Sequence, residues 1–213
     1  MRKHLTAVLL SSGAAALALG VGTAAMATTA ATWTIKPGGS YTAKSGTTTL
    51  TDTKTGAVLT CTSSTAAGTL KSGSGKTNPI GTVTKSTFTG CTGPASLTFS
   101  VKASASSTKS WKVNATGFSS GVATGNISGI HAVLTGTNNT CKATVDGTGA
   151  SAFNGKVAIK HSNSSATKLQ VTKGINLHTY NVNAGCLGAI NSGDTVTYKA
   201  TYTLNKAQTI KSP

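Results

Sequence analysis

Apolar and polar residues alternate along several segments of the chain. The clearest segment, 195–204, places every second residue on one apolar face: Val196, Tyr198, Ala200, Tyr202 and Leu204. The intervening positions are Thr or Lys, and shorter segments at 97–101, 141–145 and 157–161 show the same period of two. This period predicts strands with one buried face and one solvent-exposed face.

No segment after residue 28 shows apolar residues at helical spacing, and glycine interrupts each run that comes near it. Turn-forming residues separate the predicted strands. They are Pro37-Gly38-Gly39, Ser72-Gly73-Ser74-Gly75, Asp146-Gly147 and Asn191-Ser192-Gly193. Many short strands with frequent turns are typical of all-β folds. We therefore expect an all-β protein, built as an antiparallel β-sandwich or a barrel-like sheet.

The first 27 residues have the features of a secretory signal peptide. Three basic residues, Arg2, Lys3 and His4, precede an apolar stretch over 5–22, and Ala25-Met26-Ala27 fits an A-x-A cleavage site. Cleavage after Ala27 is expected, with Ala31 as the alternative. The remaining chain, 28–213, is then an exported soluble protein, extracellular or associated with the cell wall, and long enough for a single domain with its own core.

All four cysteines, Cys61, Cys91, Cys141 and Cys186, lie after the predicted cleavage site. An even number of cysteines in an exported chain predicts disulfide bonds, and four cysteines allow three pairings. Zinc sites usually contain pairs of cysteines two to four residues apart, and this chain has no such pair.

Four landmarks recur in the same order in two halves, about 32–102 and 111–204. They are a Trp (33 and 111), an Ala-Val-Leu-Thr tetrapeptide (57–60 and 132–135), a first Cys (61 and 141) and a second Cys (91 and 186). This pattern indicates an internal duplication, and it favours the pairs Cys61–Cys91 and Cys141–Cys186, one in each half. Because each half is small, we favour one merged domain over two separate ones.

The charge of the chain is strongly positive. Nineteen Lys and Arg residues stand against three acidic residues, which gives a formal net charge of +16. Residues 28–213 contain Lys but no Arg, the residue favoured for bidentate phosphate recognition, and the lysines are scattered. We expect weak, salt-sensitive binding to an anionic surface polymer or glycan rather than sequence-specific binding to nucleic acid. The alternative is that the lysines only keep the protein soluble and protect its edge strands.

Candidate catalytic groups are weakly supported. Ser119 lies in Gly117-Phe118-Ser119-Ser120-Gly121, a nucleophile-elbow sequence, with Asp146 and then His161 or His178 following in hydrolase order. That elbow requires a helix after the serine, and the sequence predicts none. A carboxylate pair would have to come from Asp52, Asp146 and Asp194, and His131, His161 and His178 have no partner spaced for metal binding. We therefore expect no enzyme activity, no cofactor and no metal.

Several segments resemble small exported all-β proteins of actinobacteria, a group with no established activity. They are the Ala-rich signal ending at Ala27, the start at Trp33-Thr34-Ile35-Lys36-Pro37-Gly38-Gly39, the segment Gly185-Cys186-Leu187-Gly188 and the last alternating strand. The resemblance implies export and a disulfide-bearing all-β fold. Our leading expectation is a non-enzymatic cationic protein of the cell envelope. The alternatives are a ligand- or partner-binding module, with Trp33, Trp111, Phe118 and Phe153 as candidate contacts, and a secreted serine hydrolase.

Overall fold

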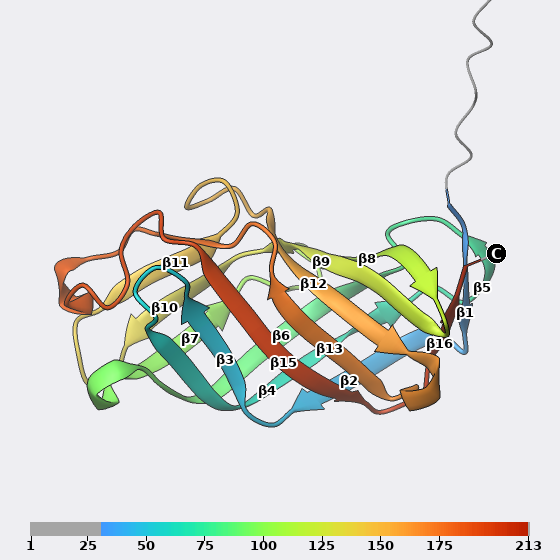
Figure 1. Ribbon diagram of the computed structural model, residues 1–213, viewed down its shortest axis with the longest axis horizontal. Helices are drawn as coiled ribbons and strands as arrows, with labels where there is room; N and C mark the ends of the chain where they lie inside the picture. The colour runs from blue at the N-terminus through green and yellow to red at the C-terminus, as the bar shows by residue number, and fades with distance from the viewer. Residues whose placement is uncertain (1–30, 213) are drawn as a thin grey trace, which may run out of the picture.

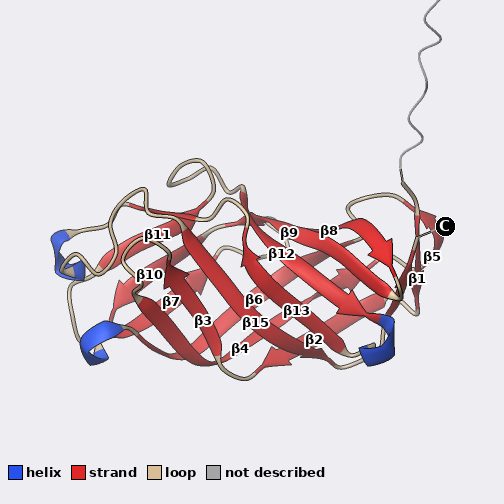
Figure 2. Ribbon diagram, viewed as in Figure 1, coloured by secondary structure: helices blue, strands red, loops and turns tan. Residues whose placement is uncertain are grey.

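The computed structural model describes residues 31–212, so the predicted signal peptide, 1–27, lies outside the described residues. The described chain is all-β, as predicted (Figure 2). Its helices are short 3₁₀ turns: η1 (Pro94–Ser96), η2 (Asn163–Ser165) and η3 (Ala184–Cys186). Among the residues that the structure describes, none of the helices is long and apolar enough to cross a membrane.

The strands follow one another with mostly short connections. In chain order they are β1 (Trp33–Lys36), β2 (Gly39–Ser45), β3 (Thr48–Asp52), β4 (Val58–Leu70), β5 (Gly73–Lys76), β6 (Gly81–Thr92), β7 (Thr98–Ala103), β8 (Trp111–Ser119), β9 (Val122–Ile130), β10 (Ala132–Gly136), β11 (Lys142–Asp146), β12 (Gly155–Ser162), β13 (Lys168–Gly174), β14 (His178–Tyr180), β15 (Val196–Leu204) and β16 (Thr209–Lys211).

Eight strands close into an antiparallel barrel in the order β2-β4-β6-β8-β9-β12-β13-β15. The last strand completes the circle, because Tyr202 of β15 lies opposite Ser45 of β2. Of the two architectures expected from the sequence, the structure adopts the barrel. Closure pairs both sides of each of these strands, which an open sheet does not achieve.

Five further strands lengthen the barrel wall at one end. β3 continues the line of β2 and pairs with both β4 and β15, and β7, β10, β11 and β14 extend the wall in the same way. Only His131 separates β9 from β10. The result is an elongated barrel, with β7, β10 and β11 at one end and the C-terminus at the other (Figure 1).

A separate three-stranded sheet, ordered β16-β1-β5, lies at the other end of the barrel (Figure 1). Its residues Trp33, Ile35 and Ile210 are buried and belong to the same apolar core as the barrel interior. The sequence prediction was wrong at one point here. The Gly-rich segment 72–75, predicted as a turn, mostly forms β5, which pairs with β1.

The alternation predicted from the sequence produces the buried face of the wall. In β12, Val157, Ile159 and His161 are buried while Lys156 and Lys160 are exposed. In β15 the buried positions are Val196, Ala200, Tyr202 and Leu204. The apolar residues therefore fill the barrel, and Thr and Lys form its outer surface, as expected for a barrel in water.

Both predicted disulfides are confirmed. Cys61 and Cys91 are directly opposite each other on β4 and β6, with Cα atoms 3.9 Å apart. Cys141, immediately before β11, is bonded to Cys186 in η3. The two sequence halves also pair with each other, at β6–β8 and at β15–β2, so that both contribute to one barrel. The duplication itself stays a prediction.

Candidate anion-binding surface and barrel interior

The three aspartates are all buried, with 1% of Asp52, 0% of Asp146 and 4% of Asp194 exposed. Each carboxylate accepts hydrogen bonds from nearby backbone N–H groups. Asp52 accepts from Lys54 and Thr55 in the turn after β3. These side chains therefore fix turns, a common role for Asp.

Asp194 holds the loop that leads into β15. Its Oδ2 accepts hydrogen bonds from the backbone and the side-chain amide of Asn191, both at 3.0 Å. Lys54 Nζ lies 3.4 Å from its Oδ1. The side-chain hydrogen bond from Asn191 does most to hold the pKa of Asp194 below its ordinary value; burial opposes this, and Lys54 adds to it.

The lysines, in contrast, reach the solvent. Sixteen of the 17 lysines within residues 31–212 are exposed, and Lys76 is half-buried. All three aspartates in this range are buried, and of the exposed lysines only Lys54 pairs with one of them, Asp194. The fold thus separates charge by burial, and the solvent-facing charged side chains of the described chain are lysines.

Part of this charge is ordered by the strand register. A row of exposed side chains crosses six neighbouring strands on the outside of the wall. Its successive members are Lys168, Thr203, Lys44, Thr65, Thr87 and Lys102. Adjacent strands lie about 4.8 Å apart, so Lys44 stands roughly 10 Å from the Lys168 position and about 14 Å from the Lys102 position along the row.

Hydroxyl groups lie between the lysines of this row. Lys168 Nζ donates to Thr203 Oγ1 at 2.7 Å, and the Oγ1 atoms of Thr65 and Thr87 lie 2.6 Å apart. The middle of the row borders an open groove of about 900 Å³. The groove contains two lysines, Lys44 and Lys85, with polar side chains that include Thr42, Thr62, Thr65, Thr203 and Asn205. We call this surface, comprising the row and the groove, the lysine–threonine face.

The residues of the hypothetical hydrolase do not come together. Ser119 ends β8 at the hairpin to β9, and no hydrogen bond joins it to a histidine within the described residues. Asp146 bonds to His131 rather than to either predicted histidine. His161 is buried, and its two ring nitrogens lie 2.9 and 2.8 Å from the carbonyl oxygens of Lys168 and Gln208. His161 therefore links the barrel to the segment before β16.

His131 and Asp146 form a structural pair. Asp146 Oδ2 lies 2.8 Å from His131 Nδ1, and the carboxylate also accepts from the N–H groups of Gly147, Phe153 and Asn154. Burial alone would raise the pKa of Asp146, but these hydrogen bonds outweigh burial and lower it. Phe153 stacks on the His131 ring at 4.3 Å, and Lys109 lies over Phe153.

The barrel interior is apolar and contains aromatic residues. Of the four aromatic residues singled out from the sequence, Trp33 and Trp111 are buried, and Phe118 and Phe153 are half-buried. Three buried or half-buried tyrosines, Tyr41, Tyr198 and Tyr202, also line the interior. Burial is the main reason that their pKa values lie above the ordinary value near 10. Tyr198 and Tyr202 were predicted to face inward with their strand, but isolated Tyr41 gave no signal.

Within residues 31–212, no group of three His, Cys, Asp or Glu side chains is placed to hold a metal ion. Comparison with protein-family models, curated proteins and solved structures found no match to the chain. The functional argument therefore starts from the surface charge and from the barrel interior.

Proposed function

We propose that this protein is a non-enzymatic cationic protein of the cell envelope or the extracellular space, and that it binds anionic surface polymers through the lysine–threonine face. The observation that carries the proposal is the burial of all three aspartates beneath a surface of exposed lysines. A polyanion approaching this surface meets ammonium groups without a competing carboxylate. Such binding releases counterions and weakens as salt concentration rises.

On the lysine–threonine face the strand register aligns several of these lysines. Hydroxyls lie between their ammonium groups, and hydroxyls can donate hydrogen bonds to phosphate or sulfate oxygens. The groove beside Lys44 and Lys85 offers a track for a linear chain. Two disulfides are typical of proteins that fold in an oxidising compartment, which supports the proposed location.

The experiment compares two variants with the same loss of charge. In one, Lys44, Lys85 and Lys102 of the lysine–threonine face are replaced by Gln. In the control, Lys112, Lys142 and Lys156 are replaced by Gln; these exposed residues lie on β8, β11 and β12, strands that contribute no residue to the lysine–threonine face. Binding to linear polyphosphate and to neutral dextran is measured by calorimetry over a range of salt concentrations.

We expect salt-sensitive binding of polyphosphate and none of dextran. The first variant loses more affinity than the control, and its slope of log K against log salt falls by roughly two. Equal losses of affinity in the two variants would mean that binding depends only on net charge, and would reject the lysine–threonine face as the binding site. Absence of polyphosphate binding at low salt would reject the proposal.

A further inference from the structure

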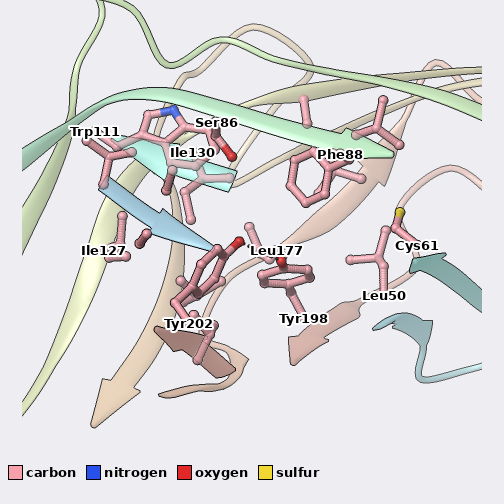
Figure 3. Close-up of a pocket in the computed structure, with 18 of the residues that line it drawn as sticks. Leu50, Cys61, Ser86, Phe88, Trp111, Ile127, Ile130, Leu177, Tyr198 and Tyr202 are labelled. Atoms are coloured by element: carbon pink, nitrogen blue, oxygen red, sulfur yellow. Dashed lines mark hydrogen bonds between the residues drawn. The ribbon is translucent and has the colours of Figure 1, made fainter. Parts of the chain in front are cut away.

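The barrel encloses a cavity of about 100 Å³ near its middle. Five aromatic side chains contribute to its lining: Tyr41, Phe88, Trp111, Tyr198 and Tyr202. Figure 3 shows the Tyr198 and Tyr202 rings facing this space from one side, with Phe88 and Trp111 across it. Aliphatic residues such as Ile130 and Leu177 complete the wall, so most of the lining offers no hydrogen bond.

Two lining residues on one side of the cavity, Tyr198 and Tyr202, belong to a chain of hydroxyl groups that continues to Ser64, outside the lining. Tyr202 Oη lies 2.8 Å from Ser64 Oγ and 2.9 Å from Tyr198 Oη (Figure 3 shows the two tyrosines). Three hydroxyls joined by two hydrogen bonds use two of their three protons. Whichever way the chain runs, the hydroxyl at one end keeps an O–H with no partner inside the chain.

A fourth hydroxyl, that of Thr48, lies beside this chain and outside the cavity lining. Thr48 is 1% exposed, and its Oγ1 makes no hydrogen bond within the described protein. It lies beside the Tyr198 hydroxyl. A buried hydroxyl without a partner is unfavourable, and buried polar groups are generally satisfied by protein, by water or by a ligand.

The size of the cavity restricts what can occupy it. A volume of 100 Å³ equals the liquid share of about three water molecules, and an engineered apolar cavity of about 150 Å³ in another protein takes up benzene while staying free of water. Pockets for drug-sized ligands are several times larger. The occupant is therefore no larger than a single ring. It is also uncharged, because the apolar lining offers a charge no counterion.

The geometry points to a binding site for a small neutral molecule with a hydrocarbon body of ring size and one oxygen, of the phenol or small-alcohol class. The body occupies the space between Phe88, Trp111 and Leu177. The oxygen meets the hydroxyls of Tyr198 and Tyr202, which line the cavity, and accepts the unused O–H there. This site is independent of the lysine–threonine face, which lies on the outside of the wall.

The test uses the purified protein with phenol and benzene as probes, followed by calorimetry and by NMR shifts of the cavity residues. Tyr198→Phe removes the hydroxyl at the end of the chain that lines the cavity, and it keeps the ring. Tyr180→Phe is the matched control, because the Tyr180 hydroxyl bonds to the Gly147 carbonyl instead. Ala132→Val narrows the cavity, and Ala207→Val is its exposed control.

We expect phenol to bind about fivefold more tightly than benzene, which is the contribution of one net hydrogen bond. Tyr198→Phe removes this preference while benzene binding persists, and Tyr180→Phe retains it. Ala132→Val weakens both probes, and Ala207→Val neither. Absence of binding of both probes at millimolar concentration overturns the site. Equal binding of phenol and benzene by the unmodified protein overturns the role of the hydroxyls, and so does a cavity filled with ordered water that phenol does not displace.

Discussion

His131 Nδ1 lies 2.8 Å from Asp146 Oδ2, at the point where β9 passes into β10. The pair also fixes the loop 147–154, since the same carboxylate accepts three backbone N–H groups at the two ends of that loop. In a hydrolase such a pair would orient a nucleophile. Here the histidine stacks on Phe153, and the bonds of the carboxylate make it part of the wall.

Replacement of Asp146 should therefore be strongly destabilising. Asp146→Ala removes four hydrogen bonds and leaves three backbone N–H groups to find other partners. We expect the free energy of unfolding to fall by about 3 kcal/mol. Chemical denaturation measures this loss. Ser107→Ala, at an exposed loop position, should change stability by less than about 0.5 kcal/mol. A small effect of Asp146→Ala would mean that the loop does not depend on the carboxylate.

Acid should destabilise the protein through two carboxyl groups. The pKa values of Asp146 and Asp194 lie below the ordinary value of 3.8 in the folded protein. Their contribution to stability is therefore complete above that value, and it is lost as the pH falls below it and through the folded pKa values. Unfolding free energies measured from neutral to acidic pH should decrease in this window. Asp146→Asn should be less stable at neutral pH and show a shallower acid-induced decrease; an unchanged decrease would contradict the assignment.

High pH should destabilise the protein through the buried tyrosines of the barrel interior. Burial raises the pKa values of Tyr41, Tyr198 and Tyr202 above 10. A raised pKa means that the stabilising contribution is complete below about pH 10 and is lost as the pH rises above it, because the unfolded chain ionises first. The ultraviolet absorbance of tyrosinate should show these groups titrating only when the protein unfolds. Their titration near pH 10 in a protein that circular dichroism shows to be folded would refute their burial.

The two disulfides should differ in the segments of the chain that they stabilise. On the chain-entropy relation, loops of 30 and 45 residues contribute about 3.6 and 4 kcal/mol. Cys61 and Cys91 lie on strands that also pair by many hydrogen bonds, whereas Cys186 belongs to the connection 181–195, with no strand of its own.

Replacing Cys141 and Cys186 together by Ser should therefore expose 181–195 to proteolysis, with first cleavage near Leu187, which is 80% exposed. The matched pair Cys61→Ser and Cys91→Ser should lower stability without a new cleavage site in that connection. Mass spectrometry of the earliest fragments distinguishes the two variants. Identical fragments would contradict this difference.

The sequence predicted the face of each strand better than the path of the sheet. Alternation over 195–204 identified the buried residues of β15, because inward and outward positions depend only on neighbouring residues. The contact that closes the barrel, Tyr202 opposite Ser45, joins residues far apart in the chain. No local pattern encodes such a contact, since it depends on the number and stagger of all the strands.

Other features needed the three-dimensional structure. The Gly-rich segment 72–75 resembles a turn, yet pairing with β1 gives it strand geometry. The cluster of Ser64, Tyr198 and Tyr202 likewise unites residues from separate strands. The lysines looked scattered along the sequence, and only the register places Lys44 and Lys102 in one row.

Closure of the barrel also limits how copies of the chain can aggregate. Strands that pair on both sides offer no unpaired peptide groups to a neighbouring molecule, and edge-to-edge addition needs such groups. In the separate sheet the outer strands are β5 and β16, of four and three residues. Each ends in a lysine, Lys76 and Lys211, the type of residue that discourages strand addition. Within residues 31–212 the open edges are thus short: β5, β16 and the three-residue β14, which pairs with β11 on one side and makes only the bridge from His178 to Thr195 on the other.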